Sequence, residues 1–132
     1  MARRRGLVAY LPDDFLASDY AVRGRFDSML LSHVAEHMHF GEAHDLVGSY
    51  LPYLRPGGRL VLMTPQEAGF RSDPTHVEYF DLDCLARLAR SLELEPDRAY
   101  SFPFPRVAGR LFKHNEFVVV ARAPGTSPSG RT

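Results

Sequence analysis

FDSMLLSHVAEH, residues 26–37, is the stretch that decides the fold. Its first half, residues 26–31, is almost continuously apolar, which is typical of a strand covered on both faces of a parallel sheet. Residues 32–38 that follow predict a turn or a short helix. Open α/β sheets bind their ligands outside the carboxyl ends of the strands, so the side chains after Leu31 are the first candidates for a site.

Strand and helix patterns alternate around this stretch. We predict further strands at residues 7–10, 60–63, 99–102 and 116–121, and amphipathic helices at 42–54 and 81–94. Pro52 should kink or shorten the first helix, residues 55–58 (Arg-Pro-Gly-Gly) should end it, and Asp81 should be the N-cap of the second. This order of elements predicts the α/β class.

Composition excludes several kinds of protein. The 132 residues suit one domain, and 16 basic against 16 acidic residues give no net charge. We therefore expect neither a nucleic-acid partner nor a membrane partner. The single cysteine, Cys84, excludes an internal disulfide and indicates a cytoplasmic protein. Residues 1–123 are predicted to form the domain, and residues 124–132, rich in Pro, Gly, Ser and Thr, a disordered tail.

His33, Glu36 and His37 form the densest cluster of functional groups. On a helix their spacing would put all three side chains on one face, where they could bind a divalent metal or provide an acid and a base. The string also matches H-x-x-E-H, the inverted zinc-peptidase motif, so a metal hydrolase is one alternative. The simpler alternative is that both histidines satisfy backbone carbonyls at a strand-to-helix corner.

Two other places carry candidate residues. Asp13 and Asp14 follow a predicted strand and could bind a hydroxyl or amino group of a cofactor, although aspartate after proline is also ordinary turn chemistry. His76 lies in a long connection after residues 60–63, where it could cover the site or be a surface histidine.

The run 26–37, a helix, then LRPGGRLVLMTP at 54–65 resembles the class I S-adenosylmethionine-dependent methyltransferases, most closely the small-molecule branch with the quinone O-methyltransferases. The likeness extends through residues 73–76 and 115–117. It implies a partial Rossmann-like sheet, mostly parallel, with an antiparallel C-terminal strand and flanking helices. It also implies transfer of a methyl group from S-adenosylmethionine to a small-molecule acceptor, with oxygen as the expected acceptor atom.

The resemblance also assigns roles to residues of this sequence. Asp14 and Phe15 would lie near the adenine of the cofactor, and Ser32 and His33 near its methionine part. His37 and His76 are the candidate catalytic bases at the acceptor. In the quinone branch an acidic residue, a Glu and a His are associated with a divalent metal; Glu36 and His37 match, but His33 stands at the acidic position, so we assign no metal ligands.

The front of the family domain is not in this sequence. Its first strand, the G-x-G-x-G cofactor loop and the acidic residue that holds the ribose have no counterpart, so the chain resembles the C-terminal part of a methyltransferase domain. In the family the strand order is 3-2-1-4-5-7-6, and residues 26–31 correspond to strand 4. Without strands 1 and 2 that strand is an open edge, which predicts self-association. A catalytically inactive remnant or an interaction module is the other alternative.

Overall fold

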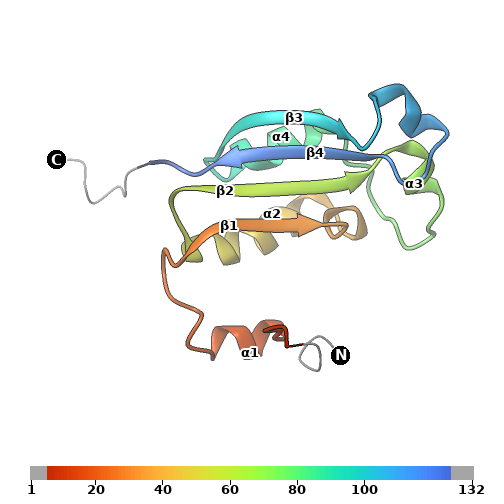
Figure 1. Cartoon of the computed structure of the whole chain (residues 1–132). Helices are drawn as coiled ribbons and strands as arrows, with labels where there is room; N and C mark the ends of the chain where they lie inside the picture. The colour runs from red at the N-terminus through yellow and green to blue at the C-terminus, as the bar shows by residue number, and fades with distance from the viewer. Residues whose placement is uncertain (1–5, 126–132) are drawn as a thin grey trace.

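A four-stranded sheet in the order β1-β2-β4-β3 forms the centre of the computed structural model, which describes residues 6–125 (Figure 1). The strands are β1 (Phe26–Ser32), β2 (Leu54–Pro65), β3 (Glu95–Phe102) and β4 (Glu116–Arg122). β1 pairs with β2 in parallel, whereas β4 is antiparallel to both of its neighbours, β2 and β3. Three strands therefore share one direction and the C-terminal strand opposes them, as the sequence predicts.

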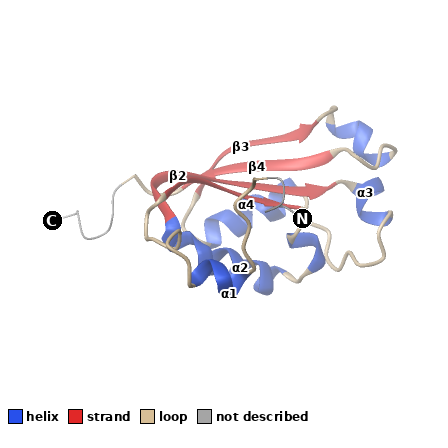
Figure 2. Ribbon diagram, turned by 60° about the horizontal axis from the view of Figure 1, so that its bottom comes forward, coloured by secondary structure: helices blue, strands red, loops and turns tan. Residues whose placement is uncertain are grey.

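The two long helices, α2 (Phe40–Tyr50) and α4 (Leu82–Ser91), cover one face of this sheet (Figure 2), whereas the short α1 (Pro12–Leu16) lies beyond the edge formed by β1 (Figure 1). The short α3 (Glu67–Arg71) lies at the end of β2. The buried core forms between this face and the helices, with Leu60, Leu62, Leu85, Leu88 and Val119 all at most 1% exposed. No helix in the described part of the chain is long and apolar enough to cross a membrane.

The two long helices are close to their predicted positions. α2 ends at Tyr50 and continues as a 3-10 helix, η3 (Leu51–Tyr53), because Pro52 cannot donate the next α-helical hydrogen bond. Asp81 is the N-cap of α4, and its carboxylate accepts a hydrogen bond of 2.8 Å from the Cys84 N–H. Both features confirm the sequence analysis.

Residues 55–58 differ from the prediction. They do not cap a helix but belong to β2, which starts at Leu54 and is 12 residues long. The pairing with β1 jumps from Phe26↔Leu54 to Ser28↔Arg59, and Gly57 takes a φ of +74° within this irregularity. Gly57 therefore serves a distorted strand start, because glycine adopts positive φ at no steric cost, and a Cβ at Gly58 would come within 2.7 Å of the Leu54 side chain.

The predicted strand at residues 7–10 is wrong. Residues 7–11 have no regular structure, and α1 follows directly. In the resemblance this segment corresponds to family strand 3, which is separated from strand 4 by strands 1 and 2. A strand forms by pairing with a neighbouring strand, and residues 7–10 pair with none of the four strands of the described sheet. As for the predicted tail, the Pro124 carbonyl accepts a hydrogen bond from the Gly57 N–H, and residues 126–132 lie outside the described residues.

A buried polar cluster ties the β3–β4 connection to the end of β2. Asn115 is 0% exposed; its amide group donates to Gln66 Oε1 and to the Phe104 and Pro105 carbonyls, and its oxygen accepts from the Phe104 N–H. A 3-10 helix, η4 (Arg106–Arg110), packs over Gln66 so closely that a Cβ at Gly109 would overlap Gln66 Oε1. This cluster positions the end of the sheet where the polar side chains gather.

We expect Gly109→Ala to destabilise the protein by about 1–3 kcal/mol, because the added methyl group overpacks the buried cluster. Gly41→Ala is the matched control: a Cβ at Gly41 meets nothing within 4 Å, and its position in α2 favours alanine by up to about 1 kcal/mol. Urea unfolding followed by circular dichroism measures both. Equal stabilities for the two variants would contradict the close packing of η4 on Gln66.

Candidate functional site

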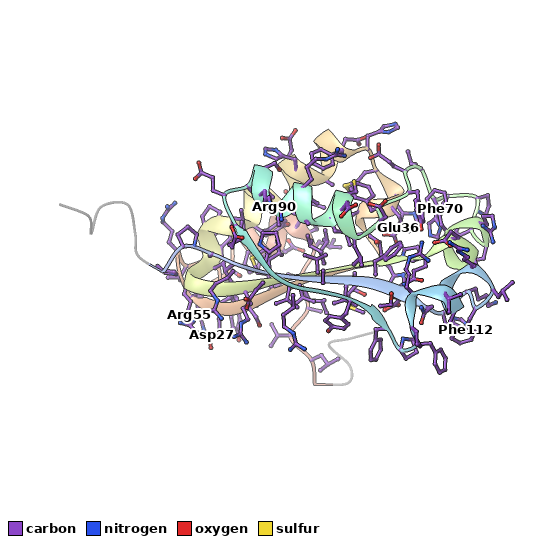
Figure 3. All side chains as sticks on the ribbon, turned by 90° about the horizontal axis from the view of Figure 1, so that it is seen from above. Asp27, Glu36, Arg55, Phe70, Arg90 and Phe112 are labelled. Atoms are coloured by element: carbon purple, nitrogen blue, oxygen red, sulfur yellow. The ribbon has the colours of Figure 1, made fainter. Side chains whose placement is uncertain are left out.

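The candidate site lies at the carboxyl ends of β1 and β2, beside the amino end of the antiparallel β4. Ser32 ends β1, Gln66 follows β2, and Glu116 begins β4. Figure 3 shows Glu36 and Phe70 at this end of the sheet, with Asp27 and Arg55 at the opposite end. The placement agrees with the rule that led to residues 32–37.

His33 makes the sharp corner after β1. Its N–H donates to the Met63 carbonyl at 3.0 Å and continues the ladder, while its φ of +57° is unusual for a residue with a side chain. The ring is held between two carboxylates, with Nε2 hydrogen-bonded to Glu116 and Nδ1 3.7 Å from Glu36 Oε1. His33 is thus fixed by its contacts, and strain of this kind is common at functional sites.

Glu36 is the centre of the cluster. It lies in a 3-10 helix, η2 (Ala35–His37), and its carbonyl accepts hydrogen bonds from the Val77 N–H at 2.6 Å and the Glu78 N–H at 3.2 Å. These bonds hold the loop after α3 against the corner after β1. The Glu36 side chain is fully buried, and neither carboxylate oxygen has a hydrogen-bond partner among the described residues.

His37 and His76, the predicted catalytic residues, are in contact although 39 positions separate them. Their ring centroids are 4.9 Å apart, and His37 Nε2 is 3.9 Å from Glu36 Oε1. His76 stacks on Phe70, and its Nε2 is 3.7 Å from Asp73 Oδ2. Hydrogen bonds from the Thr75 side chain and backbone hold the pKa of Asp73 below its usual value. The structure therefore brings together the two histidines that the sequence analysis singled out.

An open cleft of about 250 Å³ gives access to this group, lined by His33, Pro65, Gly69, Ser72, Asp73, His76, Lys113 and His114. Its walls come from the ends of β1 and β2, the loop after α3 and the segment before β4. A small ligand in the cleft would contact imidazoles and a carboxylate rather than a purely apolar wall.

The H-x-x-E-H string does not form the helical site of a peptidase. Residues 33–34 are outside the helix, and residues 35–37 form a single 3-10 turn. The two histidines therefore do not share one α-helical face: His33 contacts Glu116, whereas His37 contacts Thr75. The geometry disfavours the metal-hydrolase alternative based on His33, Glu36 and His37.

Asp14 and Phe15 lie elsewhere. Asp14 is exposed in α1, and the Phe15 ring packs against Phe26, Tyr50 and Tyr53. Phe26 and Ser32 are the two ends of β1, six residues apart, which is about 20 Å along a strand. The structure therefore does not bring Asp14 and Phe15 to Ser32 and His33, and their shared contact with a cofactor stays a prediction.

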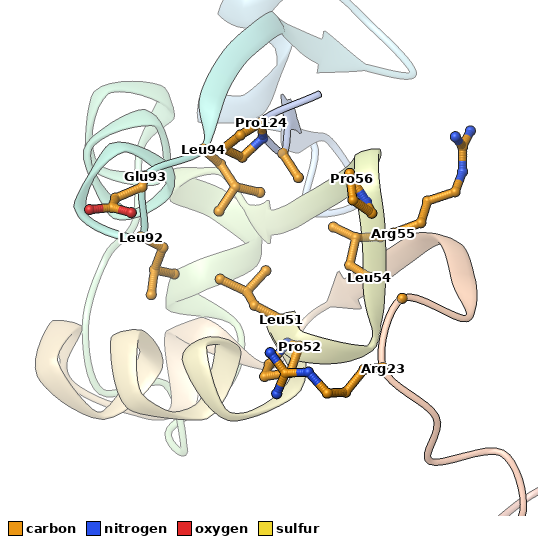
Figure 4. Close-up of a pocket in the computed structure, with 12 residues that line it drawn as sticks. Arg23, Leu51, Pro52, Leu54, Arg55, Pro56, Leu92, Glu93, Leu94 and Pro124 are labelled. Carbon is orange, nitrogen blue, oxygen red and sulfur yellow. The ribbon is translucent and has the colours of Figure 1, made fainter. Parts of the chain in front are cut away.

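A further pocket of about 380 Å³ lies at the amino ends of the parallel strands (Figure 4). Its lining is largely aliphatic, with Leu51, Leu54, Leu92 and Leu94, and Arg23 lies at its rim. None of the predicted site residues lines it. The pocket is separate from the histidine cluster.

Sequence reasoning missed Glu116 and Thr75. Glu116 contacts His33 across 83 positions, and such a long-range pair leaves no local pattern in one sequence. Thr75 had a local signal, because Asp73-Pro74-Thr75 forms a turn in which the Asp73 carboxylate accepts from both the N–H and the hydroxyl of Thr75.

In the quinone branch a divalent metal is associated with an acidic residue, a Glu and a His. The structure shows whether the residues of this chain could bind such a metal. Glu36 offers two buried oxygens without partners, and one ligand atom each from Glu36, His37 and His76 lies within 4.8 Å of the others. His33 is not part of this group: its Nε2 is hydrogen-bonded to Glu116, and its Nδ1 is 3.7 Å from Glu36 Oε1. The residues present therefore fit a divalent cation, with His76 in place of the residue at position 33.

Next to the cleft, Glu67 in α3 joins Tyr79 and Arg106. The Tyr79 hydroxyl donates to Glu67 Oε1 at 2.5 Å, and Arg106 Nη2 is 2.6 Å from the same oxygen. Burial by itself would raise the pKa of Glu67, but the hydrogen bonds from Arg106 and Tyr79 outweigh it and leave the pKa below its usual value. Burial and the bond to Glu67 raise the pKa of Tyr79. Through the Glu67–Arg106 contact, these residues hold α3 against η4.

The most informative comparisons are with solved structures. The 1,6-didemethyltoxoflavin-N1-methyltransferase of Burkholderia thailandensis, solved with its substrate and S-adenosylhomocysteine, is 22% identical with a TM-score of 0.57, over 78% of this chain and 46% of its own. A SAM-dependent methyltransferase from Archaeoglobus fulgidus is 15% identical with a TM-score of 0.64, and the match covers 88% of this chain and 66% of that one. Magnesium protoporphyrin IX methyltransferase from Synechocystis PCC 6803, with bound SAM, is 12% identical with a TM-score of 0.52, and the match covers 79% of this chain and 42% of that one.

These likenesses show the fold, that of the class I S-adenosylmethionine-dependent methyltransferases. The chain spans 42–66% of the length of the three solved structures. No family model and no curated protein matches the sequence. The observed strand order β1-β2-β4-β3 corresponds to family strands 4-5-7-6, as the resemblance implied.

We expect Glu67→Gln to reduce the free energy of unfolding at pH 7 by about 1–3 kcal/mol, because it weakens charge-assisted hydrogen bonds. A lowered carboxylate pKa stabilises the fold above the unfolded-state pKa of about 4.3, and this contribution is lost as the pH falls through the folded-state pKa. The difference between wild type and variant should therefore shrink below about pH 4 in urea unfolding. Glu95→Gln, at an exposed position of β3, is the control. A difference that did not vary with pH would contradict the assignment.

Proposed function

We propose that this chain, which has the class I methyltransferase fold, takes part in methyl transfer from S-adenosylmethionine to an oxygen of a small acceptor. The observation that carries the proposal is the convergence of Glu36, His37 and His76 at the carboxyl end of β1, on a sheet with the strand order of that fold. The sulfonium group already activates the methyl group, so the protein has to position the acceptor and handle its proton.

For the cofactor, we propose that Ser32 and His33 contact the methionine part, and that Asp14 and Phe15 lie near the adenine. Ser32 and His33 support this because they end β1, where open α/β sheets bind ligands. For Asp14 and Phe15 to reach the same molecule, the segment before β1 has to move toward the carboxyl ends of the strands. That segment packs through the Phe15 ring on aromatic side chains, with no strand pairing of residues 7–17 to β1.

For the acceptor, we propose that His37 and His76 receive the hydroxyl proton. A neutral imidazole near the acceptor oxygen suits this role at physiological pH. Exposed apolar side chains of the segment before β4, among them Phe104, Leu111 and Phe112, lie close in sequence to the cleft residues Lys113 and His114. They favour an acceptor with an aromatic or aliphatic body.

The first experiment measures cofactor binding by the whole chain, with S-adenosylmethionine and S-adenosylhomocysteine in isothermal titration calorimetry. The second incubates the chain with radiolabelled S-adenosylmethionine and small phenols and catechols, and identifies methylated products by mass spectrometry. Binding and an O-methylated product would support the proposal. Absence of both would remove methyl transfer from this chain and favour an interaction module.

We expect the double variant His37→Ala/His76→Ala to lower the rate of methyl transfer by about 10²–10⁴-fold, the usual contribution of a general base. Its affinity for S-adenosylhomocysteine should stay nearly unchanged, because neither ring is assigned to the cofactor. His44→Ala, on the outer surface of α2, is the control. Unchanged turnover in the double variant would remove both histidines from the mechanism.

We also propose that the chain self-associates through β1 in the cytoplasm. Among residues 6–125 nothing pairs with the outer edge of β1, where Leu30 is 64% exposed. The other edge strand, β3, carries Pro96, Asp97 and Arg98, which discourage pairing. We expect light scattering at tens of micromolar to show dimers or larger species, and Leu30→Lys to shift them toward monomer.

Val22→Lys is the control for this measurement, because Val22 is 51% exposed but lies outside the sheet. A monodisperse wild-type monomer, or an equal response of both variants, would count against pairing through β1.

A further inference from the structure

The Glu36 carboxylate is the feature of the site that the contacts leave unexplained. The residue is 0% exposed, and both oxygens lack a hydrogen-bond partner within the described ranges. An ionised carboxylate without a partner is unfavourable in the interior, because nothing replaces its lost hydration. A positive charge or a proton therefore has to balance it.

The protonation of the His76 ring follows from its other nitrogen. His76 Nδ1 is 2.8 Å from the Phe70 carbonyl oxygen. A carbonyl only accepts hydrogen bonds, so Nδ1 carries the hydrogen and donates. In the neutral ring Nε2 then holds the lone pair, and this nitrogen is 3.7 Å from Asp73 Oδ2. The side chain is only 9% exposed, so few waters can reach that nitrogen.

His37 has the same tautomer for a related reason. Its Nδ1 is 3.2 Å from Thr75 Oγ1 and 3.3 Å from the Thr75 carbonyl oxygen. The Thr75 hydroxyl donates its own hydrogen to Asp73 Oδ1 at 2.7 Å, so its oxygen accepts from His37 Nδ1–H. The lone pair of His37 again lies on Nε2, 3.9 Å from Glu36 Oε1.

One ligand atom each from Glu36, His37 and His76 lies within 4.8 Å of the other two. We propose that Glu36, His37 and His76 form a binding site for a divalent transition metal ion with the preferences of Zn²⁺. Two histidines and a glutamate are a known zinc ligand set that leaves one position open. The hydrogen bonds from each Nδ1 to Phe70 and Thr75 are the outer contacts that orient metal-binding histidines.

Both the position and the chemistry of this site differ from what the resemblance implied. Residue 33 lies in the acidic position of the quinone branch, but the His33 ring is taken up by Glu116. His76, from the loop after α3, supplies the third ligand instead. Two imidazoles favour Zn²⁺ over Mg²⁺, because Mg²⁺ prefers oxygen ligands and keeps several waters.

The metal site does not depend on the proposed methyl transfer. A bound ion would use the Nε2 lone pairs that otherwise accept a proton, so the ligand role and the base role compete for the same atoms. Binding is measured without cofactor or acceptor, and its failure is therefore distinguishable from a failure of methyl transfer.

The test titrates the chelator-treated full chain with Zn²⁺, Co²⁺ and Mg²⁺ in isothermal titration calorimetry, with visible spectroscopy for Co²⁺. We expect one Zn²⁺ or Co²⁺ per chain and no binding of millimolar Mg²⁺. His76→Ala should weaken zinc binding at least about 100-fold, whereas His33→Ala should change it less than about tenfold, the lower bound for an outer contact. His44→Ala, remote from the group, should bind as wild type does.

Glu36→Gln separates a loss of metal binding from a loss of folding, because glutamine has nearly the same shape as glutamate. Without metal its melting temperature should rise, since the unpaired buried charge is gone, and added Zn²⁺ should raise the melting temperature of wild type only. Failure of wild type to bind zinc, equal affinity for Mg²⁺, or a loss in His33→Ala as large as in His76→Ala would overturn the proposal.

Discussion

The pairing of β2 on both sides is the constraint from which the rest of the structure follows. β2 is parallel to β1 and antiparallel to β4. The carboxyl ends of β1 and β2 and the amino end of β4 therefore lie at the same end of the sheet. His33 and Glu116 come together there because these ends coincide. If β4 ran parallel to β2, Glu116 would lie at the opposite end of the sheet.

A second junction, between backbone groups, brings the loop after α3 to that edge. The Glu36 carbonyl accepts from two consecutive N–H groups, those of Val77 and Glu78, and so places His76 beside His37. The side chain of the same residue is buried without a partner. One residue therefore supplies both the backbone contact that stabilises the corner and the buried carboxylate of the proposed metal site.

The fold could be predicted where a local sequence pattern favours a helix or strand and that element also has a neighbour to pair or pack with. The apolar run before Ser32, the Asp81 cap and the β-branched run of β4 each depend on neighbours close in sequence, and each formed as expected. Residues 7–10 also had a strand pattern but no strand to pair with, so pattern alone was insufficient. In the site, His37 and His76 were identified as candidates, whereas the contact of Glu116 with His33 arises from sheet pairing that a single sequence does not reveal.

The sheet also divides into two parts that differ in how they can form. β1, α2 and β2 are one continuous segment, and β3 and β4 are joined by a connection of 13 residues, Pro103 to Asn115. Each part closes over short sequence distances, but the β2–β4 pairing joins Pro65 to Glu116 and Arg59 to Arg122. Such distant pairing carries the largest loop-closure cost, so we expect it to form late in folding. The His33–Glu116 contact lies across this pairing and forms only when the two parts have docked, whereas Glu36, His37 and His76 all precede β3 and β4 in the chain.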